Sequence, residues 1–434
     1  MTDPIVAGPQ PRPGKLLAAL AGIAVIAILI AAAAIFAFSS GPIASPADVI
    51  GPPVRAGDRV YILTSQWKTF RPYRRTGSRT SYTDLLIDVW AFGAKDAKPD
   101  WRTRLETRRS GVNMGRALLG ADGGRLWVLG QAGLAGLSLD DGAITADPAR
   151  IEAANPKLKG LLPKDERYYR FDAGGLGFTA ADGRAWRIDG RTLVARPDPS
   201  GAKVDIGSAV LPAHEAGGNS YWVFMQRGLR VTGGWFGLLN EREAAAILDA
   251  QRQNDNGIKP DGPGGIDPEN NPRTKMWSAK VGPRKAFFGT RQVFSDFKPL
   301  PESPEFLQGG LLSDGRIHSL PILLSKPDSF LVLHKDRLGD EGRFRLTRVS
   351  GPLGKPLWSV DLPMDRIEAV LPGDGSVVLV GSRPEKPSWR RFGETRLEDV
   401  DQVAAVEYAT GAVGIYGLKV KATRAAEIPP SSTQ

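Results

Sequence analysis

The chain contains no cysteine among its 434 residues. No disulfide can therefore stabilise it, so its stability must come from its core, and no lipid can be attached to a cysteine side chain as an anchor. Histidine is also scarce: His214, His318 and His334 lie far apart and match neither the His-x-His nor the His-Glu-x-x-His spacing of metal sites. We expect no metal and no cofactor.

Several catalytic motifs are missing as well. There is no Gly-x-Ser-x-Gly segment, which a serine hydrolase needs for its nucleophile elbow. Gly130, Gly133 and Gly136 flank a hairpin turn rather than opening a helix, so they do not form a nucleotide cradle. The stretch 254–272 fails as an EF-hand calcium loop, because Arg252 stands where the first aspartate would be. The sequence favours a non-enzymatic protein, with an enzyme as the alternative.

Charge is absent from residues 16–38, which read LLAALAGIAVIAILIAAAAIFAF and contain no proline. As a helix these 23 residues would span roughly 34 Å, enough for the hydrocarbon core of a bilayer. We expect an uncleaved transmembrane signal-anchor. A cleaved signal peptide is the competing interpretation, although its apolar part is usually shorter. Arg12 and Lys15 precede the run, so the positive-inside rule places the N-terminus in the cytoplasm and the large C-terminal part outside it.

The order of segments follows from composition. Glycine (51) and proline (34) are abundant and helical periodicity is scarce, which predicts many short strands joined by turns. The expected divisions are a cytoplasmic tail at 1–15, the transmembrane helix at 16–38, a proline-rich linker at 39–57, the large domain at 58–420 and a flexible C-terminal tail at 421–434.

A repeat of four short strands runs through the large domain. The segment AKPDW at 97–101 aligns with GKPLW at 354–358, and Gly142, Gly190 and Gly411 stand at corresponding turns. Adjacent turns are 45 to 57 residues apart, and the wide central gap fits about three units. Such a period, with four strands in each unit, is typical of a β-propeller. We expect an all-β fold with seven blades, and eight as the alternative.

Two segments carry a resemblance to a known repeat. VWAFGAKDAKPDW at 89–101 and VAAVEYATGAVGIYG at 403–417 resemble the outer strands of PQQ-like (quinoprotein-like) propeller repeats. The whole chain also resembles bacterial inner-membrane proteins that have an N-terminal anchor and such a propeller, a family without an established activity. The resemblance implies blades and a periplasmic domain on a single-pass inner-membrane protein. It does not imply bound PQQ, because the chain has neither the adjacent cysteines many such dehydrogenases use nor an identifiable ligand set.

The centre of the domain departs from the repeat. Asn240 followed by Glu243 forms a capping-box pattern, and apolar residues then recur at helical spacing. This predicts a short helix at about 241–252, followed by turn-forming residues at 254–272. We expect residues 240–275 to form a loop insertion with a mobile tip.

Charge gives the strongest indication of function. The chain carries a net charge of +10, and residues 67–82 hold five basic residues, four aromatic residues and no acidic one. Further arginines follow at 108–116 and 383–396, and in a seven-bladed ring these loops would share one face next to the closure of the ring. The candidate binding residues, all basic or aromatic, are Trp67, Lys68, Arg71, Tyr73, Arg74, Arg75, Arg79, Arg108, Arg109, Trp389, Arg390 and Arg391.

Such a basic sector predicts an anionic partner. Outside the cytoplasm this points to an envelope protein, an anionic lipid headgroup or an acidic glycan, and not to nucleic acid. Two alternatives stay open: the arginines are solvated loop residues without a partner, or the protein is a hydrolase, lyase or quinoprotein that works in the central funnel of the propeller.

Overall fold

The computed structural model describes most of the large domain. The described residues are 43–70, 82–109, 115–198, 225–226, 228–231, 234–253, 272–286, 289–312, 329–339, 342–385 and 398–418. Within these ranges no helix has the length and apolar character needed to cross a membrane. The expected anchor at 16–38 and the tails at 1–15 and 421–434 lie outside the described residues, so they stay predictions.

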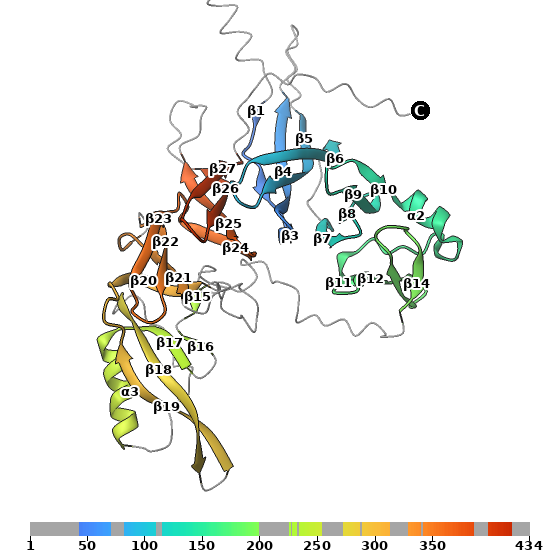
Figure 1. The fold of residues 1–434 in the computed structure, drawn as a ribbon. Coiled ribbons are helices and arrows are strands. Elements are labelled where there is room, and N and C mark those ends of the chain that lie inside the picture. The colour runs from blue at the N-terminus through green and yellow to red at the C-terminus, as the bar shows by residue number, and fades with distance from the viewer. Residues whose placement is uncertain are drawn as a thin grey trace, which may run out of the picture.

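Antiparallel strands dominate the described chain, which confirms the all-β prediction (Figure 1). The first three four-stranded units are β3 (Val54–Ala56), β4 (Arg59–Phe70), β5 (Tyr82–Gly93) and β6 (Pro99–Arg109); β7 (Ala117–Asp122), β8 (Arg125–Gly130), β9 (Gly133–Ser138) and β10 (Ile144–Ala146); and β11 (Tyr169–Asp172), β12 (Gly175–Thr179), β13 (Ala185–Ile188) and β14 (Ala195–Pro197). Two short strands, β1 (Ile43–Ala44) and β2 (Asp48–Val49), also pair with β4.

The second half of the chain contains three further units of the same kind. They are β16 (Gly228–Val231), β17 (Gly234–Leu239), β18 (Arg273–Ala286) and β19 (Gly289–Pro299); β20 (Phe306–Leu312), β21 (Ser329–Lys335), β22 (Phe344–Ser350) and β23 (Pro356–Asp361); and β24 (Arg366–Pro372), β25 (Ser376–Glu385), β26 (Glu398–Glu407) and β27 (Val413–Gly417). We number these six units first to sixth sheet in chain order. The fourth and fifth are joined where β18 pairs with β20, and β15 (Met225–Gln226) also pairs with β20.

The sheets follow one another in an arc (Figure 1). One hydrophobic cluster joins the third sheet to the second, another joins the second to the first, and others join the first to the sixth, the sixth to the fifth and the fifth to the fourth. The first and last sheets of the chain are therefore neighbours. At this seam the Ala47 amide donates to the Leu418 carbonyl (3.3 Å) and the Val49 amide to Asp401 Oδ2 (2.6 Å). The expected contact between the first and last units is present.

The two ends of the arc are closed off differently. The third sheet turns its apolar face to the second, whereas Arg170 and Arg187 on its strands form ion pairs with Asp172 and Asp198. An apolar neighbour would bury these charges at a large cost, so this charged surface suits solvent or a polar partner. No hydrophobic cluster of the described residues joins the third sheet to the fourth, and residues 199–224 between them lie outside the described ranges.

At the other end of the arc a helix covers the fourth sheet. Helix α3 (Glu241–Gln253) packs Ile247 against Trp235 and Leu239 of β17, on the face turned away from the fifth sheet. The predicted helix and capping box are confirmed: the Asn240 amide donates to Glu243 Oε2 (2.8 Å) and the Glu243 amide to Asn240 Oδ1 (2.9 Å). This part of the insertion is thus docked on the sheet. A second helix, α2 (Pro148–Ala154), was not predicted.

One turn geometry recurs between the third and fourth strands of five sheets. In each, a residue with positive φ donates its amide to the carbonyl four positions earlier. These residues are Ala97 (φ 55°), Gly142 (72°), Leu193 (63°), Gly354 (73°) and Gly411 (74°). The repeat in the sequence is therefore real, but in the third sheet the turn position is Leu193 and not Gly190.

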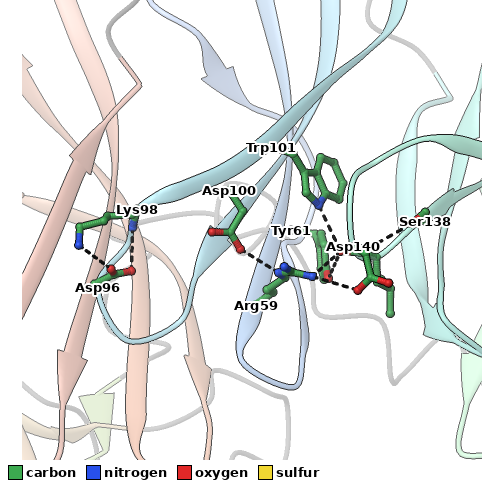
Figure 2. Close-up of polar contacts among 9 residues, drawn as sticks. Arg59, Tyr61, Asp96, Lys98, Asp100, Trp101, Ser138 and Asp140 are labelled. Carbon is green, nitrogen blue, oxygen red and sulfur yellow. Dashed lines mark hydrogen bonds and ion pairs between the residues drawn. The ribbon is translucent and has the colours of Figure 1, made fainter.

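Tryptophans connect neighbouring sheets through these turns. Trp101 Nε1 of the first sheet donates to the Leu139 carbonyl of the second (3.1 Å; Figure 2). In the same way Trp358 Nε1 of the fifth sheet donates to the Tyr408 carbonyl of the sixth (2.8 Å), and Tyr408 stands three residues before its turn glycine, as Leu139 does. Arg59 Nη1 donates to the Leu139 carbonyl as well (2.8 Å). A Cβ atom on Gly142 would lie 2.5 Å from the Trp101 ring, so the glycine gives the indole its space.

Gly142→Ala tests this contact. The substitution should lower the free energy of unfolding by about 2 to 4 kcal/mol, because the new methyl group must adopt positive φ and must also displace Trp101. The measurement is denaturant unfolding followed by tryptophan fluorescence. The control is Gly183→Ala, which has a similar φ (79°) and no neighbouring atom within 4 Å of the new Cβ. It should lose only about 1 kcal/mol, and equal losses would contradict the docking role.

Asp401 lies buried in the seam between the first and sixth sheets. Its side chain accepts the Val49 amide, and burial, helped by the nearby carboxylates of Glu368 and Asp48, raises its pKa to about 7 although Arg366 opposes the shift. The folded state therefore holds the Asp401 proton at a pH where the unfolded chain has released it.

The stability of the seam should depend on pH for this reason. With the pKa raised in the folded state, the stabilising contribution is full at low pH, below the unfolded value of 3.8, and is lost as pH rises to about 7, by up to about 4 kcal/mol. Unfolding free energies measured from pH 4.5 to 8 should fall with rising pH. Asp401→Asn, which keeps the acceptor oxygen, should flatten that fall relative to wild type. An unchanged slope in Asp401→Asn would contradict the assignment.

Candidate anion-binding surface

Three strands of the first sheet end together near the predicted basic loop. Phe70 at the end of β4 pairs with Tyr82 at the start of β5, and Arg108 and Arg109 at the end of β6 pair with Leu85 and Asp84. We call Lys68, Tyr82, Arg108 and Arg109 the first-sheet tip. The pairing explains why these residues, far apart in sequence, lie at one end of one sheet.

Aromatic and charged contacts organise the first-sheet tip. The Arg109 guanidinium carbon lies 4.1 Å from the centroid of the Tyr82 ring, a cation–π arrangement that holds the guanidinium at the sheet surface. Asp84 is directly opposite Arg109 across the two strands and is the acidic residue of this end of β5. Three basic residues against one acid leave the first-sheet tip positive.

Trp67, a candidate binding residue, and Arg116, which belongs to the arginine-containing segment 108–116, have structural roles instead. Trp67 is half-buried and packs against the hydrophobic cluster between the first and second sheets. Arg116 is buried, with 2% of its side chain exposed, and its Nη2 lies 2.6 Å from Glu106 Oε2. Glu106 Oε1 also accepts the Gln131 amide (2.5 Å), so this pair connects the first sheet to the second. Arg108 and Arg109 themselves lie in strand β6, not in a connection between blades.

An ion-pair group that the sequence did not reveal lies on the face of the first sheet that packs toward the sixth. Asp88 is buried with 1% of its side chain exposed and lies within ion-pair distance of both Arg102 and Arg104. Arg102 also covers the Trp90 ring, 4.6 Å from its centroid. The alternating arginines of β6 are visible in the sequence. Their buried partner, Asp88, can be recognised only from the pairing register of β5 and β6.

The tip of the sixth sheet points to the same side of the stack. Ser376 Oγ donates to the Ala94 carbonyl (2.7 Å), which places the start of β25 beside the end of β5. The far end of β25 therefore lies on the side where β5 begins. At that end Glu385 and Glu398 occupy opposed register positions on β25 and β26.

The remaining predicted residues lie outside the described ranges: Arg71, Tyr73, Arg74, Arg75 and Arg79 in the connection from β4 to β5, and Trp389, Arg390 and Arg391 in the connection from β25 to β26. Their assignment stays a prediction. The topology adds one fact, because the connection that carries the first five must begin and end at the first-sheet tip.

In the described part of the chain, no group of three or more histidine, aspartate or glutamate side chains could hold a metal ion. His334 is buried, its Nε2 lies 2.9 Å from Thr347 Oγ1, and burial lowers its pKa to about 4. It is a neutral packing residue at neutral pH.

Comparison with known proteins does not assign the chain to a family. No family model matches the chain, and no curated protein matches it. Among solved structures, a puromycin-hydrolyzing peptidase from Mycobacterium tuberculosis aligns with 13% sequence identity and a TM-score of 0.20, over 86% of this chain and 53% of that one. The chain thus spans about half the length of that peptidase. A likeness at this level supports no statement about fold or activity.

Proposed function

We propose that the chain is a membrane-anchored periplasmic binding or scaffold module that captures an anionic partner through a basic surface at the first-sheet tip. One observation carries the proposal: Lys68, Arg108 and Arg109 gather at the end of the sheet from which the connection 71–81 departs. That connection contains four arginines and no acidic residue. If the connection stays near the strand ends that it joins, these residues concentrate positive charge at this end of the sheet.

The chemistry of this surface suits phosphate or carboxylate groups. Arginine binds such groups with paired hydrogen bonds, and an aromatic neighbour such as Tyr82 holds the guanidinium plane in place. The partner classes are an envelope protein with an acidic face, an anionic lipid headgroup and an acidic glycan.

Capture of the partner can be tested in membranes. Full-length protein is crosslinked in place, purified and examined by mass spectrometry, and wild type is compared with a variant in which Arg71, Arg74, Arg75 and Arg79 are serine. We expect a partner recovered with wild type at low salt to be lost in the variant, because its contacts are electrostatic and screened by salt.

The matched control removes four exposed arginines elsewhere: Arg150, Arg167, Arg184 and Arg191 are replaced by serine. This control has the same net charge as the test variant, so its partner recovery should remain at the wild-type level. The proposal of a specific basic surface would be contradicted if the test variant recovered as much partner as wild type does. It would also be contradicted if the control lost as much partner as the test variant does.

We further propose that the six described sheets belong to a closed propeller of seven blades, with eight as the alternative. Supporting observations are the seam between the first and sixth sheets, the recurring turn and the repeated tryptophan contact. The missing strands would come from residues outside the described ranges, among them 199–224, which follow the third sheet in the chain.

Electron microscopy of the full-length protein in nanodiscs tests the closure. Class averages viewed along the ring axis should show a closed disc of seven or eight spokes, because each sheet is one radial blade. An open arc of six spokes would contradict the ring and leave the basic-surface proposal untouched.

A further inference from the structure

The first strand after the expected anchor pairs with the basic strand end. Ile43 lies opposite Thr69, and Ala44 lies opposite Lys68. The apolar run ends at Phe38, five residues before Ile43. Even fully extended, five residues reach about 17 Å. The end of β4 is therefore held close to the place where the chain leaves the bilayer.

The opposite end of the same sheet is much farther away. Strand β6 runs from Pro99 to Arg109, and ten residues of strand rise cover about 33 Å. The turn end, which carries Lys95 and Lys98, is separated from the tip by that length. The anchor thus selects the first-sheet tip as the end of the sheet that lies nearest the membrane.

We propose that the partner of the first-sheet tip is the anionic phospholipid headgroup layer of the membrane that holds the anchor. This inference rests on the proposed function and names the partner class of the same surface. Lys68, Arg108 and Arg109 supply positive charge within the short range over which a charged bilayer attracts basic residues, roughly a Debye length. Tyr82, held under Arg109, is an aromatic residue of the kind enriched at membrane interfaces.

The reach of the chain favours lipid over a protein or glycan partner. The expected anchor keeps headgroups permanently within reach of this tip, so no separate encounter is needed. Docking at one tip would also fix the tilt of the stack on the membrane.

Site-specific quenching tests the proposal on the full-length chain in proteoliposomes. Because the chain has no cysteine, Thr107→Cys, exposed beside the tip, gives a unique attachment point for a fluorophore. Lys95→Cys, exposed at the other end of the sheet, is the matched control. Nitroxide-labelled headgroup lipid serves as the quencher, in vesicles of phosphatidylcholine alone or mixed with phosphatidylglycerol.

We expect the Thr107 label to be quenched several-fold more than the Lys95 label when phosphatidylglycerol is present, and high salt to remove most of the difference. Replacing Lys68, Arg108 and Arg109 with serine should abolish it, whereas serine at Arg150, Arg167 and Arg184 should not. Equal quenching at both positions, or no dependence on phosphatidylglycerol, would overturn the proposal.

The result separates the two proposals. If quenching is absent but the four-arginine variant still loses a crosslinked partner, the basic surface binds an acidic protein or glycan and only the lipid assignment fails. If quenching is absent and no partner is lost, both proposals fail.

Discussion

Burial of apolar area between neighbouring sheets is the interaction on which the rest of the molecule depends. A four-stranded sheet is too thin to bury its own side chains, so each unit needs a neighbour. The first sheet shows this best: Ile62 and Phe92 pack toward the sixth sheet, and Leu63 and Ala91 toward the second. Both faces are apolar, which is why its strands read as nearly continuous hydrophobic runs.

The same constraint explains how the ends of the stack are built. A face without an apolar neighbour must be polar or must be covered. The third sheet has Arg170 and Arg187 paired with aspartates at this place, and the fourth has helix α3. The seam between the first and sixth sheets contains a buried carboxyl group, that of Asp401. Its burial beside the Val49 amide makes the stability of this junction depend on pH.

Burial also decides which arginines are available to a partner. Arg116 and Arg109 are close in sequence, yet Arg116 is buried against Glu106 while Arg109 is exposed above Tyr82. The first is a structural link between two sheets, and the second belongs to a surface. Because β1 follows the expected anchor in the chain and pairs with the end of β4, this surface lies at the end of the first sheet that is nearer to the expected anchor.

Local rules in the sequence were enough for the all-β character, the four-stranded repeat outside the centre of the chain, the capped helix after Asn240 and most of the turn positions. They did not predict β1, β2 and β3, which lie in the segment expected to be a linker. These features depend on side-chain alternation, capping and positive φ, which involve residues a few positions apart. The sequence also located the basic segments. The turn of the third sheet was predicted at the wrong residue. Leu193 occupies the position with positive φ, which usually favours glycine, so the repeat was aligned on the nearby Gly190 instead.

Tertiary structure alone decided the packing role of Trp67, the ion pairs of Asp88 and Arg116, and the burial of Asp401. Each of these depends on strand register or sheet stacking, and the Val49–Asp401 contact joins residues 352 positions apart. Side-chain periodicity carries no information about which distant segment will lie opposite.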